Sequence, residues 1–385
     1  MAKEPLEVFS VESILEDFES LSDPRSTVNR HHLLGDIVVI SILAVIAGAD
    51  GPRGIGLWAE SNKQWLQDKL PLPYGIPSHD TIGRVLMAIR PEAFQECFQT
   101  WIQRLIVSAD DKSFPVISID GKALRRSHDE SAGLGPLFLV SAWSSKQGLS
   151  LGQLATEAKS NEITAIPKLI EQIDIKGAVV TIDAAGCQKS IAEKIVAGGG
   201  DYVLALKGNQ GKLHQAVNDY LTKHLEDEFR GLNARKHIEN RKGHGRREEI
   251  TYYQVELPEG LPGQSDWQGL ETVGIVVSYR EQKDKWSTEV RYYLSSLKLD
   301  AKTFATCVRG HWGIENSLHW CLDVTFREDE TRTRNRILAD NLAWLRRFAI
   351  SLLKQVDDKE SIAMRRRKAG WNPDYLSKVL GLATS

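Results

Sequence analysis

The sequence contains little cysteine, and its cysteines do not have the spacing of a metal site. Among 385 residues there are four, with no C-x-x-C pair: Cys97, Cys187, Cys307 and Cys321. Thiols scattered in this way are typical of reduced core residues in a cytoplasmic protein. A disulfide framework and a structural zinc site are therefore poor explanations of the fold.

The sequence also lacks a secretion signal and an uninterrupted membrane-spanning stretch. Its N-terminus has acidic and polar residues where a signal peptide has a basic segment followed by an apolar one. The longest apolar run, Leu33 to Ala49, contains Asp36 and has Gly48 near its end, so we interpret it as a buried helix. We expect no association with a membrane and a cytoplasmic location.

A large net charge is absent too, although the charges are unevenly distributed. The formal net charge is -2, but acids outnumber bases from Met1 to Lys112, whereas the tail from Thr331 is rich in arginine and contains the basic run Arg365 to Lys368. Any one of these arginines is explained by a solvated helix face. Together with nearby carboxylates, the clusters favour a polyanionic binding partner.

The first 112 residues are predicted to form an all-helical domain. An apolar helix begins near Leu33, and a glycine-rich break follows from Gly48 to Gly56. Ser78 has the position of a helix N-cap, and the segment from Pro91 to Ile106 has the pattern of a further helix. We place the first domain boundary at residue 112.

From Ser113 the sequence changes to the period of β-strands. The predicted elements are a strand ending at Asp120, strands over 137–144 and 149–156, a helix over 162–173, a strand ending at Asp183, a helix over 189–197 and a strand over 202–206. This βββαβαβ order is that of an α/β protein with a ribonuclease H-like mixed sheet. Residues 113–207 and 300–385 are predicted to form this core.

The pattern between residues 208 and 299 departs from that scheme. Alternating apolar runs, which include Tyr252, Ile275 and Tyr292, are separated by proline and glycine, and they indicate an inserted β-rich subdomain. Asp300 then has the position of an N-cap for a helix from Ala301 to Val308, which returns the chain to the core.

Two aspartates are expected to meet at one edge of the core sheet. Asp120 and Asp183 each follow a short run of mostly β-branched residues, and α/β proteins place their sites at this carboxyl end of buried strands. A strand-end aspartate such as Asp183 is also a common turn residue, so this explanation stays open. Asp120 has further support because Gly121 lets the backbone pass close to a ligand.

A third acid is expected from the segment His311 to Asp323. As an α-helix, this segment stacks Glu315, His319 and Asp323 on one face, at positions i, i+4 and i+8. Glu315 is then the partner of the two aspartates, and the histidines and Asp323 are accessory candidates. An exposed helix acid is the alternative for Glu315 alone.

A set of short motifs occurs in a fixed order along the chain. They are Ile119-Asp120-Gly121-Lys122, Asp183, the run Asp201 to Gln210, the run His311 to Asn316, and Leu322-Asp323-Val324. This set resembles the H-repeat-associated insertion-sequence transposases of the DDE class, and the resemblance spans nearly the whole chain. It implies a ribonuclease H-like catalytic core with a β-strand insertion, in which Asp120, Asp183 and Glu315 bind metal.

One part of the chain departs from the pattern of related transposases. Their glutamate lies in a signature of tyrosine, arginine, glutamate and lysine. Here the arginine place holds His311, the tyrosine place holds Val308 and the lysine place holds Leu322. The phosphate contacts that this signature provides therefore need other residues, and Arg309 or His311 is the candidate.

The resemblance implies a DNA transposase that cleaves the ends of an insertion sequence and transfers the 3′-hydroxyl strand to target DNA. Two Mg²⁺ ions per site, which Mn²⁺ can replace, stabilise the entering and leaving oxygens of such a reaction. The expected partners are double-stranded terminal inverted repeats, bound in part by the helical domain, and target DNA. We also expect a homodimer on DNA, no small-molecule cofactor, and action in the bacterial cytoplasm at the nucleoid.

Two other functions are compatible with these residues. One is a stand-alone ribonuclease H-like nuclease, which cleaves DNA without joining it to a second duplex. The other is a non-catalytic DNA-binding protein derived from a transposase, which the retention of three acids disfavours.

The candidate DNA contacts are basic or polar residues near the acids or in the insertion. A glycine-interrupted basic loop in the insertion is suited to the DNA backbone, and a plain surface hairpin is the alternative. Trp286 is a candidate for stacking on an unpaired base. The contact candidates are Lys122, Arg125, Arg126, Lys207, Asn209, Arg241, Lys242, His244, Arg246, Arg247 and Arg309.

Overall fold

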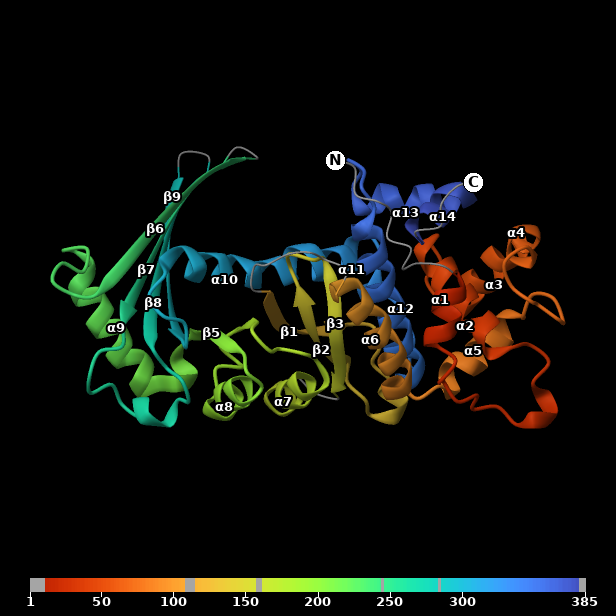
Figure 1. Cartoon of the computed structure of the whole chain (residues 1–385), viewed down its shortest axis with the longest axis horizontal. Helices are drawn as coiled ribbons and strands as arrows, with labels where there is room; N and C mark the ends of the chain where they lie inside the picture. The colour runs from red at the N-terminus through yellow and green to blue at the C-terminus, as the bar shows by residue number, and fades with distance from the viewer. Residues whose placement is uncertain (1–10, 108–114, 157–160, 244–245, 283–284, 381–385) are drawn as a thin grey trace.

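A continuous mixed sheet of nine strands organises the molecule (Figure 1). The computed structural model describes residues 11–107, 115–156, 161–243, 246–282 and 285–380. Along the sheet the strands have the order β3-β2-β1-β4-β5-β9-β8-β7-β6. The chain is therefore an α/β protein, as predicted.

The N-terminal part is helical, as predicted. Its elements are α1 (Val11–Asp17), η1 (Thr27–Asn29), α2 (Leu34–Ile46), α3 (Pro52–Ser61), α4 (Lys63–Gln67), α5 (His79–Ala88) and α6 (Pro91–Val107). Ser78 caps α5 by accepting the N–H of Thr81. Every residue of α2 from Asp36 onward is buried, so the longest apolar run is a core helix.

The ribonuclease H-like order of the core is also confirmed. Its elements are β1 (Val116–Leu124), η2 (Glu130–Ala132), β2 (Leu137–Ser144), β3 (Leu149–Thr156), α7 (Glu162–Gln172), β4 (Val179–Ile182), α8 (Lys189–Ala197) and β5 (Asp201–Leu206). Strand β1 is antiparallel to β2 and parallel to β4, and β4 is parallel to β5. Parallel neighbours thus deliver their carboxyl ends to one edge of the sheet.

The insertion between residues 208 and 299 extends this sheet. It comprises η4 (Gly208–Gln210), α9 (Gly211–Leu225), β6 (Ala234–Gly243), β7 (Arg246–Glu256), η5 (Gln264–Asp266), β8 (Thr272–Gln282) and β9 (Lys285–Ser295). Strand β9 pairs with β5 in antiparallel fashion, which joins the inserted strands to the core sheet by hydrogen bonds. The hairpins β6–β7 and β8–β9 project beyond the rest of the sheet (Figure 1).

The C-terminal part is helical and returns to the core. Its elements are α10 (Ala301–Gly313), the π-helical turn η6 (Ile314–His319), α11 (Trp320–Val324), η7 (Glu328–Glu330), α12 (Arg336–Gln355), α13 (Ile362–Trp371) and α14 (Pro373–Val379). Asp300 caps α10 by accepting the N–H groups of Lys302 and Thr303, as predicted, but the helix continues beyond Val308.

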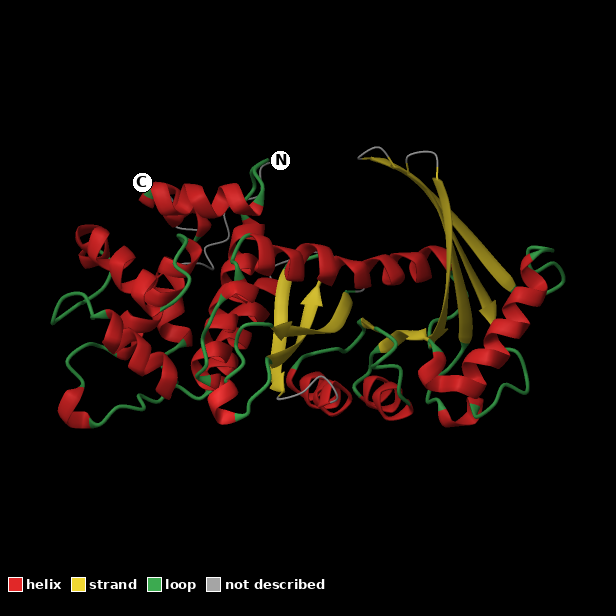
Figure 2. Cartoon of the chain, turned by 180° about the vertical axis from the view of Figure 1, so that it is seen from behind, coloured by secondary structure: helices red, strands yellow, loops and turns green. Residues whose placement is uncertain are grey.

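Helices cover both faces of the sheet (Figures 1 and 2). Helix α10 runs across one face and contacts strands of both the core and the insertion, while α7 and α8 cover the other face. The largely buried α12 packs against β3 and against α2 and α5, so the N-terminal helices and the core share one interface. Within the described ranges, no helix is long and apolar enough to cross a membrane.

Candidate active site

Asp183 directly follows β4, as predicted, and Asp120 lies where the parallel pairing of β1 with β4 ends. The predicted strand end at Asp120 is wrong, because β1 continues to Leu124 in its antiparallel pairing with β2. Ile119 of β1 is in register with Ile182 of β4, and each aspartate is the next residue of its chain. Asp120 Oδ1 accepts the N–H of Gly121 at 2.9 Å, and Asp183 Oδ1 accepts the N–H of Ala185 at 2.9 Å. Asp183 therefore does act as a turn residue, and it does so beside Asp120.

Helix α10, which leads to Glu315, is held close to these strands. Gly310 allows this approach, because an added Cβ would lie 2.8 Å from the side chain of Val116. Its carbonyl accepts the hydroxyls of Ser118, at 2.9 Å, and Ser145, at 2.7 Å. From the insertion, the guanidinium of Arg291 stacks on the ring of Trp312 at 4.2 Å. The helix is thus fixed by both the core and the insertion.

The helical register at Glu315 corrects the sequence prediction. Ile314–His319 forms a π-helical turn, and the N–H of Trp320 bonds to the carbonyl of Glu315, five residues earlier. A π turn contains one more residue than an α turn, so the prediction of a regular α-helix over this segment is wrong at this turn. Glu315 is exposed, whereas His319 is largely buried.

The charges of the neighbouring acids act on the pKa of Asp120. Burial, the charge of Asp183, and the charges of Glu162 and Glu315 raise the pKa of Asp120 to about 7, against the opposing effect of the Gly121 N–H. A carboxylate with this pKa is protonated about as often as it is charged near neutral pH. The cluster thus has an excess of negative charge that a cation would relieve.

Glu162 belongs to this cluster and was not predicted from the sequence. It is the first residue of α7, is 8% exposed, and its carboxylate occupies the place that a Cβ at Gly121 would need. Gly121 is thus required for this close approach. In the sequence, Glu162 is only an acid in the first turn of a predicted helix. Acids are common there because they interact favourably with the helix dipole, so its position did not indicate a metal or catalytic site.

His319 approaches Asp120 from the π turn. Its Nδ1 lies 3.5 Å from Asp120 Oδ2, and its Nε2 is buried without a hydrogen-bond partner in the described part of the chain. Burial, together with the nearby cations Arg347 and Lys122, lowers the pKa of His319 to about 3, so the ring is neutral. A neutral imidazole carries a proton on only one of its two nitrogens. Of the two, Nδ1 is the one that faces an acceptor, the Asp120 carboxylate.

His311 lies deeper in the same region. Its Nδ1 is 3.3 Å from the hydroxyl of Thr181, which donates to Ser118 at 3.1 Å. Burial lowers the pKa of His311, although the charge of Asp183 opposes this effect. The residue at the arginine place of the signature is therefore a neutral histidine bonded to the sheet.

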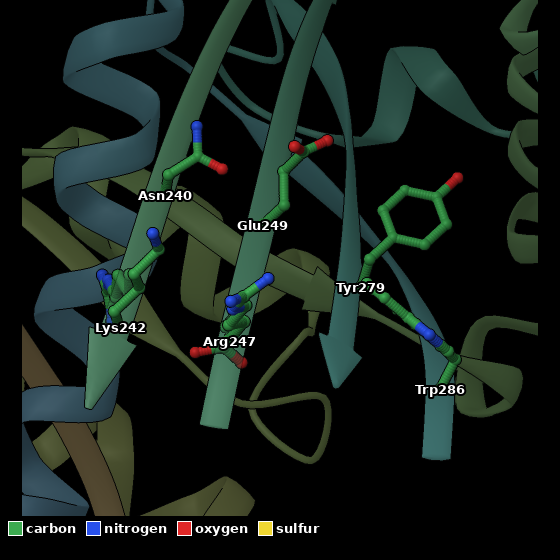
Figure 3. Close-up of a pocket in the computed structure, with 8 residues that line it drawn as sticks. Asn240, Lys242, Arg247, Glu249, Tyr279 and Trp286 are labelled. Atoms are coloured by element: carbon green, nitrogen blue, oxygen red, sulfur yellow. The ribbon is translucent and has the colours of Figure 1, made fainter. Parts of the chain in front are cut away.

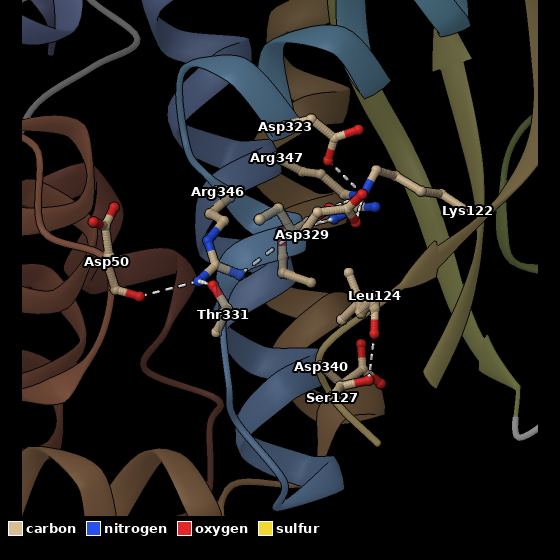
Figure 4. Close-up of polar contacts among 12 residues, drawn as sticks. Asp50, Lys122, Leu124, Ser127, Asp323, Asp329, Thr331, Asp340, Arg346 and Arg347 are labelled. Atoms are coloured by element: carbon tan, nitrogen blue, oxygen red, sulfur yellow. Dashed lines mark hydrogen bonds and ion pairs between the residues drawn. The ribbon is translucent and has the colours of Figure 1, made fainter. Parts of the chain in front are cut away.

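Lys122 and Asp323 form part of a buried ion network (Figure 4). Lys122 Nζ lies 2.7 Å from Asp323, 2.8 Å from Asp329 and 3.4 Å from Glu328. Burial opposes the charge of Lys122, but these carboxylates outweigh it and raise its pKa. Lys122 is only 8% exposed. The Lys122 ammonium and the Asp323 carboxylate thus form an ion pair with each other.

The network continues to the N-terminal helices through two buried arginines. Glu328 is fully buried and pairs with Arg347 at 3.1 Å. Arg346 donates to Thr331 Oγ1 and to the carbonyl of Asp50, each at 3.0 Å (Figure 4). Although burial alone would raise the pKa of Glu328, Arg347, Lys122 and Arg346 lower it. The segment after α11 is therefore anchored to the N-terminal part.

Comparisons with known proteins identify the family to which this geometry belongs. A family model described as "Transposase DDE domain" matches residues 103–353, and one described as "DDE_Tnp_1-associated" matches residues 15–102. The chain belongs to the DDE transposase family. Its ribonuclease H-like sheet and its ordered motifs agree with this assignment.

Relatives of the transposase match over nearly their whole length. The H repeat-associated putative transposase YhhI of Escherichia coli (strain K12) is 41% identical, with 96% of this chain and 98% of the relative covered. The putative transposase YncI of Escherichia coli O157:H7 is 38% identical, covering 96% and 95%. A piggyBac transposase synaptic complex with hairpin DNA has a TM-score of 0.39 at 10% identity, covering 98% of this chain and 79% of that one.

The residues of the transposase core that were predicted to contact DNA differ in whether their side chains are free to reach a ligand. Arg125 is 80% exposed and pairs with Asp329 at 3.1 Å, and Arg126 and Lys207 are also exposed. The Asn209 amide instead donates to the carbonyl of Ala184 at 2.6 Å, so it fixes the loop that follows Asp183.

The basic residues of the insertion lie on the projecting hairpins. Glu239 of β6 pairs with both Arg241 and Arg309, at 2.9 Å each, which ties α10 to β6. Lys242 is exposed, and Arg247 is 70% exposed with Glu281 3.9 Å away. His244 and the side chain of Arg246 lie outside the part of the chain that the structure describes.

One face of these hairpins carries a shallow cavity of about 430 Å³ (Figure 3). Asn240, Glu249 and Tyr279 stand opposite one another on β6, β7 and β8, and Lys242 stands opposite Arg247. Trp286 on β9 completes the lining and is 69% exposed. The face thus combines cations with an uncovered aromatic ring.

The acids provide ligands of the type that Mg²⁺ prefers, since all are hard carboxylate oxygens. As the side chains stand, no three histidine, cysteine or acidic residues in the described ranges are close enough to hold an ion. Glu315 is exposed and its side chain can change rotamer, whereas Asp120 is fixed by Gly121. The carboxylate chemistry of the site fits a divalent cation.

Proposed function

We propose that this transposase cleaves the ends of an insertion sequence and joins the 3′-hydroxyl strand to target DNA at a site formed by Asp120, Asp183 and Glu315. The observation that supports the proposal is a buried aspartate among other carboxylates in a member of the DDE transposase family: burial, together with the charges of Asp183, Glu162 and Glu315, raises the pKa of Asp120 to about 7. Burial and repulsion of this kind are costly for the charged form unless a cation is bound there.

The side chains have different parts in this proposal. Asp120 and Asp183 are the fixed ligands, Glu315 is the mobile one, and Glu162 contributes a fourth carboxylate beside them. His319, whose Nδ1 lies 3.5 Å from Asp120 Oδ2, is proposed to orient this carboxylate. Two divalent cations, Mg²⁺ or Mn²⁺ in its place, would supply the stabilisation of charge on the attacking and leaving oxygens.

The DNA contacts divide into those that bind phosphate and those that position the site. Arg125, Arg126 and Lys207 are exposed, and we propose that they bind the strand that is cleaved. Lys122 and Asn209 hold site loops in place through the contacts described above. In the insertion, Lys242, Arg247 and the adjoining basic loop are proposed to bind the DNA backbone.

The proposal is tested with duplexes that carry the terminal inverted repeats flanking the gene. Replacement of Asp120, Asp183 or Glu315 by alanine should each abolish Mg²⁺-dependent cleavage without loss of DNA binding. Full activity in any one variant would remove that residue from the site. Replacement of Arg246 and Arg247 should weaken binding and flatten its salt dependence by about 0.9 in log–log slope for each phosphate that is no longer bound.

The same assay separates the two alternatives. A stand-alone nuclease cleaves but yields no product joined to a second duplex, and a non-catalytic DNA-binding protein shows no metal-dependent turnover. Sedimentation of the chain with and without the repeats tests the proposed homodimer, for which we expect two copies per pair of ends.

A further inference from the structure

The two residues that the sequence offered for the missing phosphate contacts are both engaged elsewhere. Arg309 pairs at 2.9 Å with Glu239, whose side chain is only 15% exposed and also contacts Arg241. His311 is a neutral ring bonded to the hydroxyl of Thr181 in the sheet. A phosphate bound beside the acids would therefore need another cation.

Arg291 of the insertion lies at the edge of the sheet from which Asp183 emerges. Strand β5 is parallel to β4, which leads to Asp183, and its last residue, Leu206, is level with Tyr292 of β9. Arg291 comes next to this pair, across from Lys207, which directly follows β5. Because the carboxyl ends of parallel strands share one edge, Arg291 and Lys207 lie at the edge that carries Asp183.

Arg291 also projects to the face of the sheet that Asp183 shares. Alternate residues of a strand point to the same face, and Thr181, two residues before Asp183, faces α10 through its bond with His311. Arg291 faces α10 as well, since its guanidinium stacks at 4.2 Å on Trp312, the next residue of that helix. Burial lowers the pKa of His311; the charge of Asp183 opposes this shift and that of Arg291 adds to it. The guanidinium and the carboxylate thus flank one imidazole.

The contacts of Arg291 allow its guanidinium to exchange one partner for another. Trp312 supports the planar group, and the ion pair is with Glu289 at 2.6 Å; the Arg291 side chain is 25% exposed and that of Glu289 is 51% exposed. A pair with an exposed acid contributes little to stability, so a phosphate can replace Glu289 at low cost. A guanidinium that is already oriented by a ring can bind phosphate through two N–H groups.

We propose that Arg291, together with Lys207, binds a backbone phosphate of the cleaved DNA strand, in place of the arginine that the signature lacks. The inference rests on the proposed function, since it takes the cleaved bond to lie at Asp120, Asp183 and Glu315. Two strand spacings, about 10 Å, separate β9 from β4, so this phosphate belongs to a nucleotide near the cleaved bond. The contact positions the strand and is independent of its sequence.

The test is a double-mutant cycle between Arg291 and single phosphates of the duplex. Duplexes with the terminal inverted repeats carry a neutral methylphosphonate at one position at a time along the cleaved strand. Their affinity for the full-length protein is measured without divalent metal, so that no cleavage occurs. At the phosphate that Arg291 binds, the modification should weaken binding by the wild type by about 10- to 100-fold.

The Arg291→Ala variant should bind the unmodified duplex more weakly by a similar factor, and its log–log salt slope should fall by about 0.9. At one position alone, the methylphosphonate should have no further effect on this variant. Arg291→Lys keeps the charge but not the planar fork, so it should show a reduced effect at that same position.

A matched control is Arg235→Ala, since Arg235 is an exposed arginine of the same subdomain, the second residue of β6, and donates to the carbonyl of Ala234. It should bind like the wild type and keep the sensitivity to every methylphosphonate. A purely structural role of Arg291, which ties the insertion to α10, predicts weaker binding with unchanged sensitivity at all positions. That result, in Arg291→Ala or in Arg291→Lys, would overturn the inference.

The readouts separate this inference from the proposed function. If Asp120→Ala abolishes cleavage while Arg291→Ala keeps the wild-type sensitivity to every methylphosphonate, only the phosphate contact is wrong. If cleavage survives in Asp120→Ala while the effect at one phosphate depends on Arg291, the contact stands and the catalytic assignment fails.

Discussion

His319 Nδ1 lies 3.5 Å from Asp120 Oδ2, and this contact crosses from the π turn to strand β1. The imidazole is neutral, because burial and the flanking cations lower its pKa to about 3. We propose that the neutral ring, whose Nδ1 faces the carboxylate, orients Asp120 without neutralising it.

Loss of this contact should weaken metal binding more than folding. We predict that His319→Ala lowers the apparent affinity for Mg²⁺ in DNA cleavage by about 10- to 100-fold, as for other residues that orient a ligand. His319→Asn, whose amide can replace the Nδ1 donor, should recover much of it. Equal Mg²⁺ dependence in the alanine variant and the wild type would argue against the orienting role.

Gly121 should be intolerant of any side chain. The added methyl of Gly121→Ala overlaps the Glu162 carboxylate, so this buried side chain has to move away, and we expect a loss of about 1–3 kcal/mol in the free energy of unfolding. Gly135→Ala is the matched control, since a Cβ there meets nothing within 4 Å. The double variant Gly121→Ala with Glu162→Ala should regain stability; if it does not, the clash is not the cause.

The buried ion network should make Glu328 indispensable to folding. Glu328→Gln leaves Lys122, Arg346 and Arg347 short of negative charge in a buried place, and we predict a loss of about 3–5 kcal/mol in denaturant unfolding. Glu330→Gln, two residues along, breaks only a surface pair with Arg327 and should change stability little. Similar unfolding midpoints for the two variants would contradict this prediction.

Asp340 should give the stability a measurable pH dependence. Burial raises its pKa to about 6, although Gln153 donates to the carboxylate. A raised pKa means that the folded state favours the protonated acid, so this stabilisation is present below pH 4 and is lost as the pH rises toward 6. Asp340→Asn should be more stable than the wild type at pH 7 by on the order of 2 kcal/mol, and the difference should vanish at pH 4.

The meeting of Asp120 with Asp183 and the core sheet could be predicted because their cause is local, although β1 continues past Asp120 to Leu124. A run of β-branched residues predicts a buried strand, and parallel neighbours necessarily bring their carboxyl ends together. The cap at Asp300 and the helix boundaries of α7 and α8 follow from the same short-range patterns. These elements needed no knowledge of distant contacts.

Other features of the site depend on packing that spacing does not encode. The π turn adds a residue to a segment that has ordinary helical composition, so an α-helical stripe was the natural prediction. Lys122 follows a strand-end acid in the manner of an exposed basic residue, yet it is buried among carboxylates that include Asp329, 207 residues later in the chain. Glu162 could not be distinguished in the sequence from other acids that begin a helix.

The shared sheet is a further property that the sequence could not reveal. Alternating runs predicted the inserted strands, but the pairing of β9 with β5 joins segments that lie far apart in the chain. The sequence of a strand does not specify which strand it pairs with, because the hydrogen bonds between strands involve only backbone groups.

The most direct test of the account is strand-resolved cleavage and joining of the terminal inverted repeats in Mg²⁺ by the wild type and by Glu315→Gln. This change removes the mobile carboxylate and leaves the fixed aspartates intact. The account predicts 3′-hydroxyl ends and joined products from the wild type, and neither from the variant at undiminished DNA binding. Cleavage and joining by Glu315→Gln at the wild-type rate would contradict it.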